Sequence, residues 1–296
     1  MRRGMVVEQK TAMSSPALPR HLTRNAVELP RTRYAPCGDM SIAYQAFGTG
    51  PVDLVVMLGW VSHLELMWQH PSLSRFLHRL ASFARVIVFD KRGTGMSDRA
   101  LESMTAANRV ADLEAVLDAA GSKQAVLLGI ADGAGTACMF AAEHPSRVSR
   151  LVLYAASAKA PAGLEEAITT IRAEWGEPVF IERDAPSMAA NAAFRNWLAL
   201  FLRMSASPGT AIAMLKVDAR LDLGRIAPAV RVPTLVLHRT GDRAVPVAAG
   251  KELAAQIRAA RFVELAGVDH LPFVGDVEPL CAAVEAFVKA DIEDID

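Results

Sequence analysis

Cysteine is scarce in this 296-residue sequence: Cys37, Cys138 and Cys281 are its only three, and they lie far apart. No Cys-X-X-Cys pair occurs, so neither a zinc site nor a disulfide framework is indicated. Buried, reduced thiols in a cytoplasmic protein are the simplest expectation. We accordingly expect no bound metal.

An excess of charge of either sign is also lacking, because 32 basic residues balance 32 acidic ones. The overall charge therefore gives no reason to expect nucleic acid or an anionic membrane as a partner.

Long apolar runs are missing as well. No stretch approaches the roughly 20 apolar residues that a membrane span needs, and the apolar run near the N-terminus is too short for a signal peptide. The oligomeric state is left open.

The charge imbalance that does exist lies at the ends of the chain. Residues 1–34 carry seven Lys or Arg against two Glu, and prolines interrupt any periodicity there. We expect residues 1–31 to form a flexible basic arm, since they offer few large apolar groups to bury. The mostly acidic residues 291–296 are expected to form a frayed tail.

Between these ends, short apolar runs alternate with amphipathic stretches. Strands are predicted over 33–37, 40–47, 52–58, 85–89, 124–128, 150–154, 233–238 and 261–265. Helices are predicted over 71–81, 105–120, 132–144, 247–259 and 279–290. This order predicts an α/β fold with a mostly parallel eight-stranded sheet and helices on both faces. Its core is expected to span residues 32–157 and 229–290.

The alternation lapses over residues 158–228, where helices are predicted over 164–175, 189–204 and 208–219. We expect this segment to be a helical cap inserted into the core and placed over its active edge. Several large side chains are candidates for lining a pocket beneath it, although residues at helical spacing also serve as plain cap core. These candidates are Trp68, Trp175, Phe180, Trp197, Phe201 and Met204.

The most informative stretch is Val126-Leu-Leu-Gly-Ile-Ala-Asp-Gly-Ala-Gly135. It has the layout of a nucleophile elbow, in which G-x-S-x-G forms a sharp turn between a strand and a helix. Gly129 and Gly133 occupy the two glycine positions, and the nucleophile position is occupied by Ala131.

Three further loops leave predicted strand ends, and in an open parallel sheet the carboxyl ends of strands form the ligand site. The backbone N–H groups of Trp60 and Asp132 are candidates for an oxyanion hole. Asp242 follows one late strand and is placed to orient an imidazole. His270 follows the next and is the candidate general base. The order elbow, acid, histidine is the chain order of α/β-hydrolases.

The sequence resembles the α/β-hydrolase superfamily, and more narrowly the actinobacterial α/β-hydrolase domains that often precede a class III adenylate cyclase. The resemblance is carried by Arg31–Gln45, Leu80–Asp98 and Pro233–Asp242. It implies the α/β-hydrolase fold and cofactor-free hydrolysis of a carboxylic ester or similar acyl substrate. The serine of the superfamily maps onto Ala131, its acid onto Asp242 and its histidine onto His270.

A methyl group cannot attack a carbonyl, so Ala131 leaves three hypotheses open. In the first, the protein is a hydrolase whose serine was replaced, by design or by natural loss. In the second, it is an inactive relative that binds a small apolar ligand or a partner protein. In the third, other chemistry operates, with Asp132 as nucleophile, Ser157 as a substitute, or the His270–Asp242 pair as a base without covalent catalysis.

Overall fold

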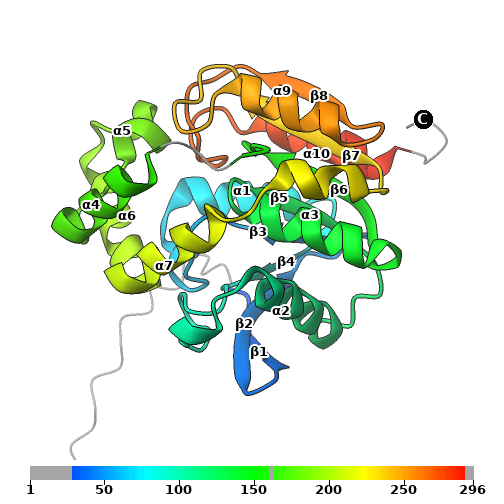
Figure 1. The fold of residues 1–296 in the computed structure, drawn as a ribbon, viewed down its shortest axis with the longest axis horizontal. Coiled ribbons are helices and arrows are strands. Elements are labelled where there is room, and N and C mark those ends of the chain that lie inside the picture. Colours follow the sequence, from blue (N-terminus) through cyan, green and yellow to red (C-terminus); the bar gives the residue numbers. More distant parts are fainter. Residues whose placement is uncertain (1–28, 160–162, 291–296) are drawn as a thin grey trace, which may run out of the picture.

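The computed structural model describes residues 29–159 and 163–290. Most of the predicted basic arm and the predicted acidic tail therefore lie outside the described residues. A single eight-stranded sheet has the order β1-β2-β4-β3-β5-β6-β7-β8 (Figure 1). The strands are β1 (Arg33–Cys37), β2 (Met40–Phe47), β3 (Asp53–Met57), β4 (Arg85–Phe89), β5 (Ala125–Ile130), β6 (Val148–Tyr154), β7 (Thr234–Arg239) and β8 (Arg261–Leu265). β1 and β2 form an antiparallel hairpin, β2 joins β4 antiparallel, and the remaining pairs are parallel. The predicted sheet is confirmed.

The central strands are buried on both faces, which explains their nearly continuous apolar sequences. In β3, Leu54 and Val56 contribute to one apolar cluster, and Val55 and Met57 contribute to the other. Helices α1 (Pro71–Ala81) and α10 (Glu278–Lys289) complete the first cluster. Helices α2 (Ala106–Ala119), α3 (Gly133–Glu143) and α9 (Val247–Gln256) complete the second. The fold is thus a three-layer sandwich of helices, sheet and helices.

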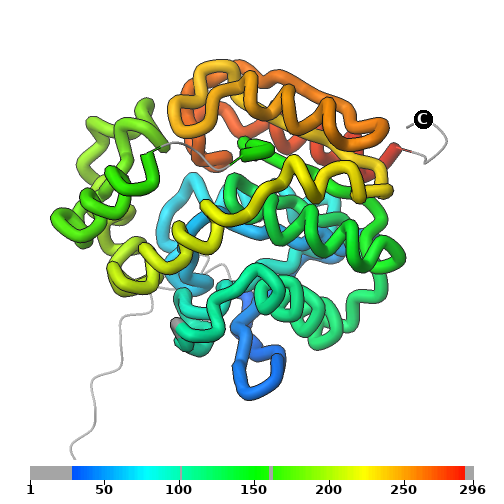
Figure 2. Tube along the Cα trace, in the orientation of Figure 1, coloured from blue at the N-terminus to red at the C-terminus, as the bar shows by residue number. Residues whose placement is uncertain are grey.

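A run of helices separates β6 from β7 and lies beside one end of the sheet (Figure 1). It contains α4 (Leu164–Glu174), α5 (Ile181–Asp184), α6 (Ala192–Ser205), α7 (Pro208–Asp218) and α8 (Leu223–Ile226). The Cα trace leaves the core after β6, passes through these helices and returns before β7 (Figure 2). α6 begins three residues later than predicted because the Asn191 side chain accepts a hydrogen bond from the Phe194 amide and caps the helix there.

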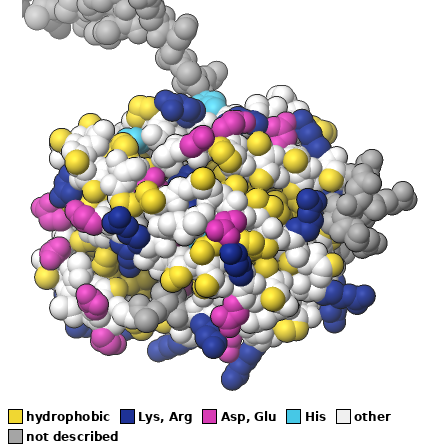
Figure 3. All heavy atoms as spheres, turned by 90° about the horizontal axis from the view of Figure 1, so that it is seen from above, with side chains coloured by type: hydrophobic (Ala, Val, Ile, Leu, Met, Phe, Trp, Pro, Cys, Tyr) yellow, Lys and Arg dark blue, Asp and Glu magenta, His cyan; other side chains and the backbone are white. Residues whose placement is uncertain are grey.

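Short 3-10 helices fill several connections, at Leu66–Gln69, Leu101–Ser103, Pro145–Arg147, Pro186–Met188 and Ala227–Ala229. Within the described residues, no single helix is long and apolar enough to cross a membrane, although α6 and α7, bent by 83° at their junction, would pass that test as a pair. Cys138 and Cys281 are buried as expected, whereas Cys37 is partly exposed, and all three are free thiols. On the face shown in Figure 3, basic and acidic side chains are interspersed with apolar ones.

Candidate active site

The turn after β5 has the tight geometry that the glycine pattern predicts. Ala131 stands at its apex with φ of 51°, a left-handed conformation that costs energy for any residue with a Cβ. A Cβ on Gly129 would lie 2.7 Å from the Cα of Ala134, and one on Gly133 would lie 2.5 Å from the carbonyl oxygen of Met57. Both glycines are therefore required by close backbone approach, and together they hold Ala131 at the sheet edge.

The loop after β3 lies directly against this turn. A Cβ on Gly59 would be 3.6 Å from the Cβ of Ala131 and 3.1 Å from Oδ1 of Asp132. Among the described residues, the backbone N–H groups of Trp60 and Asp132 donate to no backbone carbonyl. These are the two donors that the sequence analysis predicts for an oxyanion hole.

The predicted acid and base come together from separate loops. Nδ1 of His270 lies 2.7 Å from Oδ2 of Asp242. The other carboxylate oxygen, Oδ1, accepts hydrogen bonds from the amides of Ala244 at 2.8 Å and Val245 at 3.0 Å. Burial disfavours the charged imidazole, but the hydrogen bond and charge of Asp242 outweigh it, so the pKa of His270 is raised. Burial also works against the Asp242 carboxylate, and its hydrogen bonds outweigh this and keep its pKa below the ordinary value.

Sequence reasoning missed two features that hold the His270 loop in place. Arg239, at the end of β7, is almost fully buried and donates to the carbonyl oxygens of four residues of that loop. From the other side, the carbonyl oxygen of Asp184 accepts the amides of His270 at 2.9 Å and Leu271 at 3.0 Å. A charged residue at the end of a mostly apolar strand was the available signal for Arg239.

A cavity of about 310 Å³ lies between the helices that follow β6 and the edge of the sheet, and Ala131, Asp132 and His270 line it. Most of its wall is apolar, and Trp197 and Phe201 of α6 contribute to it as predicted. Ser157 also lines the cavity, but its hydroxyl accepts the amide of Lys159 at 3.3 Å in a local turn.

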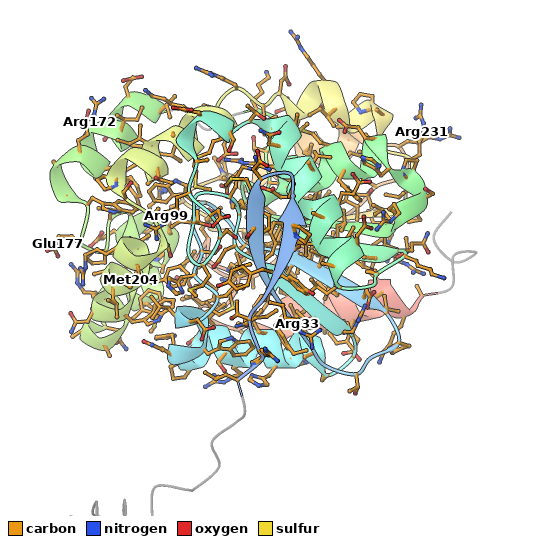
Figure 4. The ribbon with its side chains drawn as sticks, turned by 90° about the horizontal axis from the view of Figure 1, so that it is seen from below. Arg33, Arg99, Arg172, Glu177, Met204 and Arg231 are labelled. Carbon is orange, nitrogen blue, oxygen red and sulfur yellow. The ribbon has the colours of Figure 1, made fainter. Side chains whose placement is uncertain are left out.

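Three of the predicted lining residues lie elsewhere. Trp68 is buried in the core, where its indole donates to Gln45 at 2.8 Å. Trp175 packs edge-on against Trp60, with ring centroids 5.4 Å apart, outside the cavity wall. Met204 is 48% exposed and lies at the outer surface (Figure 4). Periodicity finds the apolar face of a helix but does not say which members of that face border a cavity.

Two ion pairs stand at the elbow side of the cavity. Asp132 precedes α3, but its carboxylate makes no cap hydrogen bond with that helix and instead lies 3.3 Å from Nζ of Lys91. Asp218, at the end of α7, pairs with the buried Arg109 of α2. Burial, together with the charge of Asp132, raises the pKa of Asp218 to about 7 against the opposing charges of Arg109 and Lys91. Within residues 29–159 and 163–290, no group of three or more His, Cys, Asp or Glu side chains is arranged to hold a metal.

The sheet order, the elbow and the loops that meet at it define the class of protein. A sequence model of the alpha/beta hydrolase fold family matches residues 63–177. The chain has the α/β-hydrolase fold, and its sequence is similar to that of α/β-hydrolase proteins.

Individual relatives add detail. The AB hydrolase superfamily protein YisY of Bacillus subtilis (strain 168) is 28% identical over 226 residues, which cover 69% of this chain and 81% of that protein. The pimeloyl-[acyl-carrier protein] methyl ester esterase of Vibrio campbellii (strain ATCC BAA-1116) is 28% identical over 261 residues, covering 83% and 98%. The crystal structure of the enol-lactonase from Burkholderia xenovorans LB400 superimposes with a TM-score of 0.75 at 23% identity, covering 87% of this chain and 100% of that one.

Proposed function

We propose that the cavity is an ester site of the serine-hydrolase type, built for a small carboxylic ester or similar acyl substrate, in which Ala131 occupies the nucleophile position. The observation that carries this is the conjunction at one sheet edge of the left-handed apex at Ala131 and the 2.7 Å His270–Asp242 hydrogen bond. The similarity to a methyl ester esterase supports the ester class. We also propose that, among α/β-hydrolases, the protein is most similar to the actinobacterial domains that often precede a class III adenylate cyclase.

Each residue has a defined role in this proposal. The amides of Trp60 and Asp132 bind the carbonyl oxygen as negative charge develops on it. His270 accepts the proton of an attacking hydroxyl, and Asp242 fixes the imidazole with Nδ1 protonated. The protein as it stands lacks that hydroxyl, so it binds the ester and does not form an acyl-enzyme. Binding of a small apolar ligand without turnover is the second candidate function, and the largely apolar cavity wall favours it.

The test is to supply the hydroxyl. Ala131→Ser should hydrolyse p-nitrophenyl acetate and butyrate on the order of 10³-fold faster than the parent protein, and Ala131→Ser/His270→Ala should lose about 10²-fold or more of that gain. Ala155→Ser is the matched control, because Ala155 also lines the cavity and also has a left-handed backbone (φ of 52°), but it lies after β6.

The proposal fails if a folded Ala131→Ser protein neither turns over these esters nor reacts with a serine-directed fluorophosphonate. Turnover by the parent protein that depends on His270 would instead support base chemistry without a covalent intermediate. Ligand binding with no turnover in any variant would favour the second candidate function.

A further inference from the structure

A second histidine lies beside Asp242 and has no place in the chemistry described so far. His238, near the end of β7, is fully buried. Its Nε2 is 2.8 Å from the carbonyl oxygen of Val245 and 3.6 Å from Oδ2 of Asp242. A carbonyl oxygen only accepts hydrogen bonds, so Nε2 carries the proton. Burial lowers the pKa of His238, which agrees with a neutral ring.

The other ring nitrogen of His238 has no partner. Nδ1 is buried and makes no hydrogen bond within the described chain. It lies against α9, where a Cβ on Gly250 would be only 2.3 Å from it. An apolar side chain of similar size would avoid burying an unpaired nitrogen. The feature that an imidazole supplies here is therefore the donor at Nε2.

The Nε2 donor of His238 is connected to Asp242 through Val245. The Val245 amide donates to Oδ1 of Asp242 at 3.0 Å, and the Val245 carbonyl accepts from His238. His238 thereby fixes the segment that holds Oδ1, which leaves Oδ2 directed at His270 at 2.7 Å. In addition, its N–H dipole lies near the Oδ2 carboxylate oxygen.

We propose that His238 is a positioning residue, which holds Asp242 through Val245 so that its carboxylate stays aligned with His270. This inference rests on the proposed function for its catalytic meaning. The charged and titratable groups around the two histidines are few. His238 faces Asp242, His270 and Glu264, and His270 faces Asp242, Asp184 and Arg183. If the Asp242 carboxylate becomes less firmly held, the main effect should therefore be on the pKa of His270.

The experiment follows the imidazole of His270 by NMR in the full-length protein labelled with ¹³C-histidine, with the signal assigned through His270→Gln. His238→Leu removes the donor at similar volume and should lower the pKa of His270 by about 0.5 to 1 unit. His238→Gln keeps an N–H group within reach of the Val245 carbonyl and should restore most of the shift. Gly250→Ala should reproduce the loss although residue 238 is still a histidine, because the added methyl would lie 2.3 Å from Nδ1 and must displace the ring.

Gly209→Ala is the control, since a Cβ there would meet nothing closer than 4.0 Å. An unchanged pKa of His270 in folded His238→Leu and Gly250→Ala would overturn the inference. If His238→Leu does not fold, the pKa of His270 in Gly250→Ala alone tests the inference.

In the Ala131→Ser background, His238→Leu should lower kcat about tenfold at unchanged KM. An inert Ala131→Ser protein would count against the proposed function alone, because the NMR shift is measured without turnover.

Discussion

Ala131 carries a backbone strain that serves no purpose in a site without a nucleophile. A left-handed conformation costs an alanine about 1–2 kcal/mol, whereas glycine adopts it freely but loses about 0.5–1 kcal/mol of chain entropy on folding. Ala131→Gly should therefore raise the free energy of unfolding by about 0.5 kcal/mol, measured by urea denaturation with tryptophan fluorescence.

Ala115→Gly in the middle of α2 is the matched comparison and should lower the free energy of unfolding by about 1 kcal/mol. Equal losses in the two variants would show that the apex is not strained.

How far the candidate site was predictable depends on the kind of residue. Gly129, Gly133, Asp242 and His270 were found because each combines a residue type with a place at a strand end. His238 and Arg239 were missed because one polar residue in or ending an apolar strand does not reveal its partners. Those partners, the carbonyl of Val245 and the carbonyls of the His270 loop, are brought together only by the fold.

The strands and the longer helices were predictable as elements because two-sided burial leaves apolar runs and one-sided burial leaves stripes. The four-residue helices α5 and α8 were missed, since four residues carry no period. Contacts between elements were not predictable either. Asp218 of α7 and Arg109 of α2 are 109 positions apart in the sequence, and nothing local marks them as a pair.

That pair should make stability depend on pH. The folded-state pKa of Asp218 is about 7 and its ordinary value is 3.8. Between about pH 4 and pH 7 the folded protein holds a proton that the unfolded chain has released, so this group's contribution to the free energy of unfolding falls as pH rises through that window. The total change is on the order of 4 kcal/mol.

Asp218→Asn should remove this contribution, so the stability of the variant relative to the parent should rise between pH 4 and pH 8 in urea titrations. Asp222→Asn serves as control, because Asp222 is half-exposed and pairs with the exposed Arg225. A stability difference between parent and Asp218→Asn that stays constant with pH would contradict the assignment.

At the scale of the whole molecule, the cavity exists only because the helices between β6 and β7 lie against the loops of the sheet edge. Its apolar wall should take a neutral acyl ester and reject the corresponding carboxylate, whose charge would lose its hydration. Ethyl hexanoate at about 100 times its Kd should stabilise the fold by about 2.7 kcal/mol. Thermal denaturation should then show Tm rising by about 5 °C or more, and sodium hexanoate should have little effect.

Filling the cavity tests whether the ester binds there. Leu198 of α6 lines the cavity, whereas Leu200 of the same helix is 37% exposed at the surface. Leu198→Trp should occupy the empty space, keep the Tm of the free protein near that of the parent and abolish the shift caused by the ester. Leu200→Trp adds the same side chain outside the cavity and should leave the shift intact. If both variants keep the shift, the ester binds elsewhere, and the cavity is then only a packing defect between the helical segment and the sheet.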